Sequence, residues 1–142
     1  MTRDAILALT ERRIAAWNAR DAAALAATHA PAGIVTSPTG GVLEGRAEIE
    51  RVYRIWLTAF PDLVYEPIDL LIDGNRAVQI ARLVATHSGD FFGLAPTGRR
   101  LEFQAAVLMT VHDDLVTEER RIYDFTGVLV QVGVLKAKPA AG

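Results

Sequence analysis

Two side chains in the second half of the sequence have the type and setting needed for acid–base chemistry. Asp124 lies in the stretch IYDFTGVLVQVGVL, where the residues that follow it are mostly apolar. An unpaired carboxylate is costly to bury, so its pKa rises instead, as a general acid or base working near neutral pH requires. His87 lies at the end of another strand-like segment. We predict a catalytic pair of Asp124 and His87; the alternatives are a carboxylate that closes a strand end and a histidine bonded to the neighbouring loop.

Further residues are candidate substrate contacts. Alternation places Arg120 on the strand face of Asp124, about 13 Å from it and too far for a direct ion pair. Gln104 is an amide that can hydrogen-bond a ligand if its strand register turns it inward. Three aromatic residues suit either the core or the wall of a binding pocket, and we include them as substrate contacts: Trp17, Trp56 and Phe60.

Composition narrows the chemistry. The chain of 142 residues has no cysteine, which excludes disulfides and thiolate ligands. The run His112-Asp113-Asp114 is explained by a hairpin turn, so we expect no metal there. The sequence has no nucleotide-binding motif, so no nucleotide cofactor is indicated. A net charge of −2 provides no basic surface for nucleic acid or an anionic membrane.

No apolar run is long enough to span a bilayer and no secretory signal is evident, so we expect a cytoplasmic protein.

The elements that position these residues are helices in the first half of the chain and strands in the second. Apolar residues at 3–4 spacing predict helices up to about residue 17 and over 46–60, with a short Ala-rich helix between them. Two turns, at Asp73-Gly74 and Asp113-Asp114, join four predicted antiparallel strands within residues 63–125. This order predicts an α+β fold in which helices cover one face of a curved sheet and enclose an apolar cavity. We expect one domain over residues 1–135 and a flexible tail over 136–142.

Several segments, in order, resemble one family. They are Phe60-Pro61-Asp62, Asp73-Gly74-Asn75-Arg76, THSGDFFGLAPTGR at 86–99, residues 103–109 and RIYDFTGVLVQVG at 121–133. The sequence resembles the SnoaL-like polyketide cyclase family of the NTF2-like superfamily. The resemblance implies a cone-shaped α+β barrel and a cofactor-free aldol ring closure, or a related isomerisation, on an aromatic polyketide-like small molecule. It also implies that Asp124 is the general acid/base and that His87 and Gln104 line the pocket.

Two other functions remain open for the same fold. An epoxide hydrolase would favour two acids bridged by an arginine around a water, with Arg120 or Arg82 facing inward. A non-catalytic module would hold an apolar small molecule in the pocket.

Whichever of these functions applies, the uncovered face of the sheet is expected to carry the apolar residues Val78, Ile80 and Val84. These residues predict a homodimer.

Overall fold

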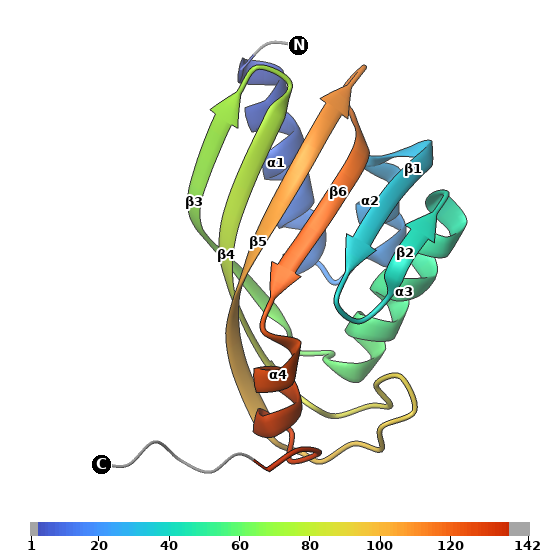
Figure 1. The fold of residues 1–142 in the computed structure, drawn as a ribbon, viewed down its shortest axis with the longest axis vertical. Helices are drawn as coiled ribbons and strands as arrows, with labels where there is room; N and C mark the ends of the chain where they lie inside the picture. The colour runs from blue at the N-terminus through green and yellow to red at the C-terminus, as the bar shows by residue number, and fades with distance from the viewer. Residues whose placement is uncertain (1–2, 137–142) are drawn as a thin grey trace.

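The computed structural model describes residues 3–136, so the predicted tail lies outside the described residues apart from Lys136. Six strands form one open sheet in the order β2-β1-β6-β5-β4-β3 (Figure 1). The strands are β1 (His29–Ser37), β2 (Gly41–Glu44), β3 (Val64–Asp73), β4 (Arg76–Thr86), β5 (Arg100–His112) and β6 (Leu115–Tyr123). The four strands expected in the second half are confirmed, with β6 ending two residues earlier than predicted.

The helices lie mainly on one side of this sheet. They are α1 (Arg3–Asn18), α2 (Ala22–Ala27), α3 (Arg46–Ala59) and α4 (Phe125–Gln131). Figure 1 shows α1, α2 and α3 behind the sheet, while α4 follows the end of β6 and lies near the loop that joins β4 to β5. The predicted α+β class, with helices covering one face, is therefore confirmed.

Helix α3 follows the apolar spacing of its sequence. Ile49, Val52, Tyr53 and Trp56 are buried, whereas its outer face carries arginines and glutamates. Side chains three and four residues apart lie on one face of a helix. The helix consequently turns Tyr53 and Trp56 towards the sheet.

Strand β1 makes the sheet mixed, because it pairs with β6 in parallel while the other neighbouring strands are antiparallel. Val35 lies opposite Glu119 in this pairing, and His29 lies opposite Val116. The sequence predicts only a short extended piece at residues 33–37, with His29 in a capping or solvent role. That expectation for His29 is wrong, since the strand begins at this residue and its side chain is fully buried.

An irregularity in β6 decides which of its side chains face the helices. Thr110 of β5 lies opposite Glu118, but the next residue, Val111, lies opposite Val116. Thr117 is therefore an extra residue in β6, as in a β-bulge. Because the bulge shifts the alternation by one position, Val116 and Glu119 are both buried although they are three positions apart in the sequence.

Candidate active site

A small pocket lies between the inner face of the sheet and helices α1 and α3. Its volume is about 40 Å³, room for roughly a few water molecules, so a polycyclic guest would need side chains to move. Most of its wall is apolar or aromatic, and three charged residues interrupt it. The lining residues are Arg13, Trp17, Trp56, Tyr65, Leu83, Phe103, Ala105, Val107, Glu119, Arg121 and Tyr123.

The aromatic walls of the pocket are flat and interlocked. The rings of Trp17 and Tyr65 stack with centroids 5.5 Å apart and planes 4° from parallel. On the α3 side, Trp56 meets Tyr123 edge to face at 5.8 Å. The Tyr123 hydroxyl is hydrogen-bonded to Thr39 Oγ1 at 2.7 Å, which ties this wall to the β1–β2 turn. Flat aromatic walls favour a planar apolar guest.

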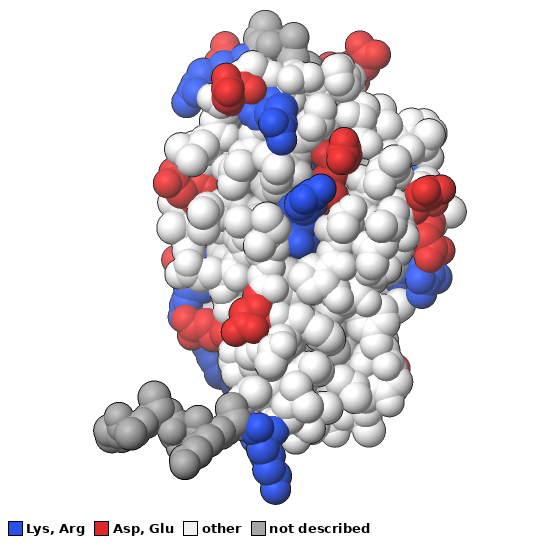
Figure 2. Space-filling view, viewed as in Figure 1, with Lys and Arg blue, Asp and Glu red and all other residues white. Residues whose placement is uncertain are grey.

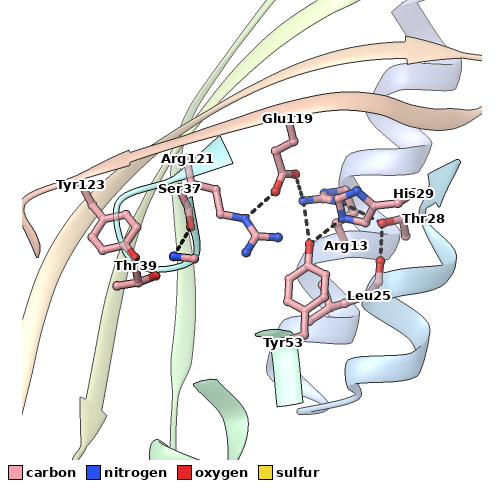
Figure 3. A network of polar contacts seen from close by, with 11 residues as sticks. Arg13, Leu25, Thr28, His29, Ser37, Thr39, Tyr53, Glu119, Arg121 and Tyr123 are labelled. Carbon is pink, nitrogen blue, oxygen red and sulfur yellow. Dashed lines mark hydrogen bonds and ion pairs between the residues drawn. The ribbon is translucent and has the colours of Figure 1, made fainter. Parts of the chain in front are cut away.

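The polar part of the pocket is built around Glu119. Its carboxylate is fully buried and forms ion pairs with two arginines, Arg13 from α1 and Arg121 from β6. Arg121 Nε donates to Glu119 Oε2 at 2.6 Å, and Arg13 Nη2 donates to Oε1. Figure 3 shows the two guanidinium groups reaching Glu119 from different elements. Desolvation makes such buried charges stable only when they are paired and hydrogen-bonded.

Arg13 also connects Glu119 to a buried histidine and tyrosine. Its Nη1 donates to Thr28 Oγ1 at 2.8 Å and lies 3.2 Å from His29 Nε2. The Tyr53 hydroxyl lies 2.7 Å from the same His29 nitrogen (Figure 3). Because a guanidinium can only donate, His29 Nε2 is an acceptor and the ring proton is assigned to Nδ1. That Nδ1 is buried without a hydrogen-bond partner among the described residues.

Burial and charge shift the titration of these groups in different directions. Burial tends to raise the pKa of Glu119, but Arg13 and Arg121 outweigh it and lower the pKa to about 2. Burial lowers the pKa of His29 to about 3. Burial likewise raises the pKa of Tyr53 above its usual range. At neutral pH the cluster therefore holds two guanidinium cations, one carboxylate, a neutral imidazole and a neutral phenol.

The structure places two of the predicted substrate contacts at this pocket. Trp17 and Trp56 line it, while Phe60 lies behind Trp56, with ring centroids 5.4 Å apart, in the hydrophobic core. A contact between substrate and either tryptophan stays a prediction. Phe60 is not among the lining residues.

His87 lies in the core, at the root of the β4–β5 loop. Its Nδ1 is 3.0 Å from Thr97 Oγ1 and accepts from the Thr97 backbone N–H at 3.3 Å. The ring packs beside Phe60 and Phe91, and it does not line the pocket. These contacts are those of a histidine bonded to its neighbouring loop, the alternative to a catalytic role.

Asp124 does not occupy the sheltered position that the sequence predicts for it. It is the N-cap of α4, its carboxylate accepts from the Gly127 N–H at 2.9 Å, and its side chain is exposed. The expectation of a buried carboxylate is wrong because the apolar residues after Asp124 form a helix, and a helix start favours an aspartate. Asp124 and His87 belong to different surroundings and are not brought together at the pocket.

Gln104 and Arg120 lie on the opposite face of the sheet. Both are exposed, whereas their neighbours Phe103, Ala105, Glu119 and Arg121 line the pocket. Arg120 and Gln104, selected from the sequence as candidate substrate contacts, therefore do not face the pocket. Adjacent residues of a strand point to opposite faces, so an error of one position exchanges the whole set of lining residues.

The charged residues that do meet at the pocket were not selected from the sequence. Arg13 shows one usable signal, because it sits in the apolar stripe of the first helix between Leu9 and Trp17. Glu119 and Arg121 alternate with exposed residues, so either set could have faced inward. His29 shows no local signal, since its burial depends on the pairing of β1 with the distant β6.

Two further findings concern residues 3–136. Within this range no group of three or more His, Cys, Asp or Glu side chains is arranged to hold a metal ion. In the same residues, no helix has the length and apolar character needed to cross a membrane.

The chain is similar to a known protein family. The model of the SnoaL-like polyketide cyclase family matches residues 8–132. No curated protein sequence matches the chain.

Solved structures share the fold. A candidate hydroxylase, AclR from Streptomyces galilaeus, is 27% identical with a TM-score of 0.81, over 93% of this chain and 83% of that one. A candidate SnoaL-like polyketide cyclase from Jannaschia sp. CCS1 is 21% identical with a TM-score of 0.84, over 94% of both chains. An NTF2-like protein of unknown function from Burkholderia pseudomallei is 16% identical with a TM-score of 0.78, over 94% of this chain and 99% of that one. These likenesses confirm the NTF2-like fold.

Proposed function

The chain belongs to the SnoaL-like polyketide cyclase family, and from this premise we propose that it catalyses a cofactor-free proton transfer on an aromatic polyketide-like small molecule. The transfer leads to an intramolecular aldol ring closure or to an isomerisation. One observation carries the proposal: a fully buried carboxylate, Glu119, lies between two arginines in the wall of an aromatic pocket.

The chemistry assigned to this site is enolate formation. Glu119 accepts a proton from a carbon next to a substrate carbonyl, and the electron pair moves onto the carbonyl oxygen. The positive charges of Arg13 and Arg121 stabilise the enolate, as fixed charges do best in a site that excludes water. The enolate carbon then attacks a second carbonyl of the same molecule, and the proton held by Glu119 returns to the new alkoxide.

The lowered pKa of Glu119 restricts the substrate. A carboxylate with a pKa of about 2 is a weak base, so only an unusually acidic carbon can lose a proton to it at a useful rate. Carbons between two carbonyl groups, which polyketide-like molecules contain, meet this requirement. The aromatic walls around Trp17 and Trp56 suit the flat, conjugated body of such a molecule.

The proposal is tested by the exchange of an acidic carbon-bound proton for deuterium. We expect the protein to accelerate exchange in ethyl benzoylacetate, an aromatic β-keto ester, followed by NMR in D₂O and corrected for the buffer rate. Glu119→Gln should lower the catalysed rate at least about 100-fold, the lower end of what a positioned acid or base contributes. Glu119→Asp keeps the negative charge between the arginines and controls for loss of fold, and it should retain part of the rate.

Asp124→Asn provides the matched comparison, because it is the residue that the sequence alone selects. Asparagine caps helices about as well as aspartate, so this variant should fold and exchange normally. Full activity of Glu119→Gln together with an inactive Asp124→Asn would return the catalytic role to Asp124. Binding without any accelerated exchange in the unmodified protein would leave a non-catalytic binding module.

The geometry does not favour the epoxide hydrolase alternative. That chemistry favours two acids bridged by one arginine around a water. The described residues that line the pocket have the reverse arrangement, a single acid between two arginines.

A further inference from the structure

The charges in the pocket do not balance. Arg13 and Arg121 contribute two positive charges and Glu119 one negative charge, which leaves a net charge of +1 among the described lining residues. The nearby groups do not change this sum at neutral pH, because burial keeps His29 and Tyr53 neutral. A buried charge without a counter-charge is strongly unfavourable, so the uncompensated cation does not serve to stabilise the fold.

Arg121 has the cationic group whose hydrogen-bonding capacity is only partly satisfied. Its side chain is 10% exposed, and its Nε is committed to Glu119 at 2.6 Å. Its Nη2 is buried and has no hydrogen-bond acceptor among the described residues. In Figure 3 the two terminal nitrogens of Arg121 point away from Glu119 and carry no drawn interaction. A charged donor left unpaired in a buried site costs more than a neutral one.

We propose that the molecule bound in this pocket is a planar organic anion whose ionised oxygen, a carboxylate or an ionised enol, accepts a hydrogen bond from Arg121 Nη2. Arg121 is then the residue that selects charged over neutral aromatic compounds. This inference rests on the proposed function only in that it uses the same pocket as the substrate site.

A flat organic anion can both balance the charge of the pocket and pack against its aromatic walls, whereas other occupants cannot do both. A water molecule or a neutral carbonyl oxygen would accept the hydrogen bond and leave the net charge unchanged. An inorganic anion would balance the charge without using the aromatic walls formed by Trp17, Tyr65 and Trp56. Only an anionic oxygen attached to a flat apolar body contacts both parts of the pocket.

A purely structural role for Arg121 makes a different prediction. Its guanidinium carbon lies 4.6 Å from the centre of the Tyr53 ring, and such a cation–π contact stabilises a partly desolvated cation. If that contact were the whole role of Arg121, its removal would change stability and leave the ranking of ligands unaffected. Ligand discrimination therefore separates the two accounts.

The test compares pairs of flat probes that differ in charge, by isothermal titration calorimetry on the full chain. The first pair is benzoate and benzamide; the second is 4-nitrophenolate and 4-nitroanisole, at a pH where the phenol is ionised. We expect the anion of at least one pair to bind about tenfold more tightly than its neutral partner, as one charged hydrogen bond provides. The pair that shows the preference identifies the carboxylate or the ionised enol as the preferred group.

Three variants place the preference on Arg121. Arg121→Gln should bind both members of each pair equally, and Arg121→Lys should keep part of the preference because it keeps the charge. Arg76→Gln removes the same charge from the exposed start of β4 and is the control, with unchanged discrimination. Arg121→Gln is also expected to fold, since it leaves Glu119 and Arg13 as a balanced pair.

The outcomes also separate this inference from the proposed function. Equal affinity for the charged and neutral members of both pairs overturns the inference and leaves the proton-transfer proposal in place. A preference that survives in Arg121→Gln assigns the recognition elsewhere and overturns it too. If none of the four probes binds the unmodified protein, the pocket is not a ligand site, and both proposals fail.

Discussion

His29 acts in the neutral form, as a hydrogen-bond acceptor for Arg13 and Tyr53. A protonated ring would place a further cation beside Arg13 and would remove the acceptor that His29 Nε2 provides for both donors. The cluster therefore depends on the ring staying unprotonated and on Glu119 staying ionised. Both conditions fail in acid, which links the folding of this chain to pH.

We predict that the free energy of unfolding falls in two stages as the pH is lowered. Below about pH 6.5 the unfolded chain protonates His29, whereas the folded chain resists until about pH 3. Below about pH 4.5 the unfolded chain protonates Glu119, whereas the folded chain keeps it ionised to about pH 2. In both stages the unfolded chain binds more protons than the folded chain, so stability falls with pH.

Urea unfolding at a series of pH values measures this dependence. His29→Asn should remove the upper stage, so its unfolding free energy should change little between neutral pH and about pH 5. His112→Asn alters an exposed histidine at the end of β5 and is the matched control. An unchanged slope in His29→Asn would show that its ring is not the titrating group.

The sequence around Asp124 is misleading because two physical explanations produce the same pattern. An acid ahead of apolar residues is expected both for a buried carboxylate and for the N-cap of an amphipathic helix. The hydrogen bond from the Gly127 backbone N–H to the Asp124 carboxylate identifies Asp124 as an N-cap. Glu119, by contrast, stands next to Glu118 in a strongly charged stretch that gives no sign of burial.

At the scale of the elements, the bulge at Thr117 explains most of the difference between the predicted and observed site. If side chains alternated without interruption from the buried Val116, Arg120 and Asp124 would both lie on the buried face. The extra residue moves that face to Glu119 and Tyr123. Helices α1 and α3 and the hairpin strands follow local periodicity and turn signals, so they could be predicted. The bulge and the β1–β6 pairing depend on distant contacts, so they could not.

Helix α4 gives a stability prediction of its own. Asp124 caps its start, and Gln131 at its end exchanges two hydrogen bonds with the backbone of Glu102 in β5, at 2.8 and 2.9 Å. Because the helix is held to the sheet, loss of its cap should reduce global stability. We expect Asp124→Ala to lower the free energy of unfolding by about 1 kcal/mol and Asp124→Asn to change it little. Urea denaturation measures both, and equal losses in the two variants would contradict the capping role.

At the scale of the whole molecule, the sheet face opposite the helices carries several exposed or half-buried apolar side chains between its charged residues. Figure 2 shows large uncharged areas on this side between scattered charged groups. Leu71 is 61% exposed and Ile122 is 54% exposed, and the half-buried Val78 and Ile80 lie on the same face. Apolar patches of this kind are typical of association surfaces. The homodimer inferred from the sequence stays a prediction that this surface supports.

Sedimentation equilibrium at micromolar concentration tests it. We expect a dimer for the unmodified chain and a shift towards monomer in Ile122→Lys, because a lysine there would be desolvated at the interface. Ala15→Lys adds the same charge on the exposed side of α1 and should not change the mass. A monomeric mass for the unmodified chain would refute the prediction.

The two tryptophans of the sequence, Trp17 and Trp56, both line the one aromatic pocket described above. The tryptophan fluorescence of the unlabelled protein therefore originates entirely from that wall. Any compound that enters will alter the emission of these indoles by quenching or by excluding water. Libraries of natural products can thus be screened optically against the native chain, with no added dye.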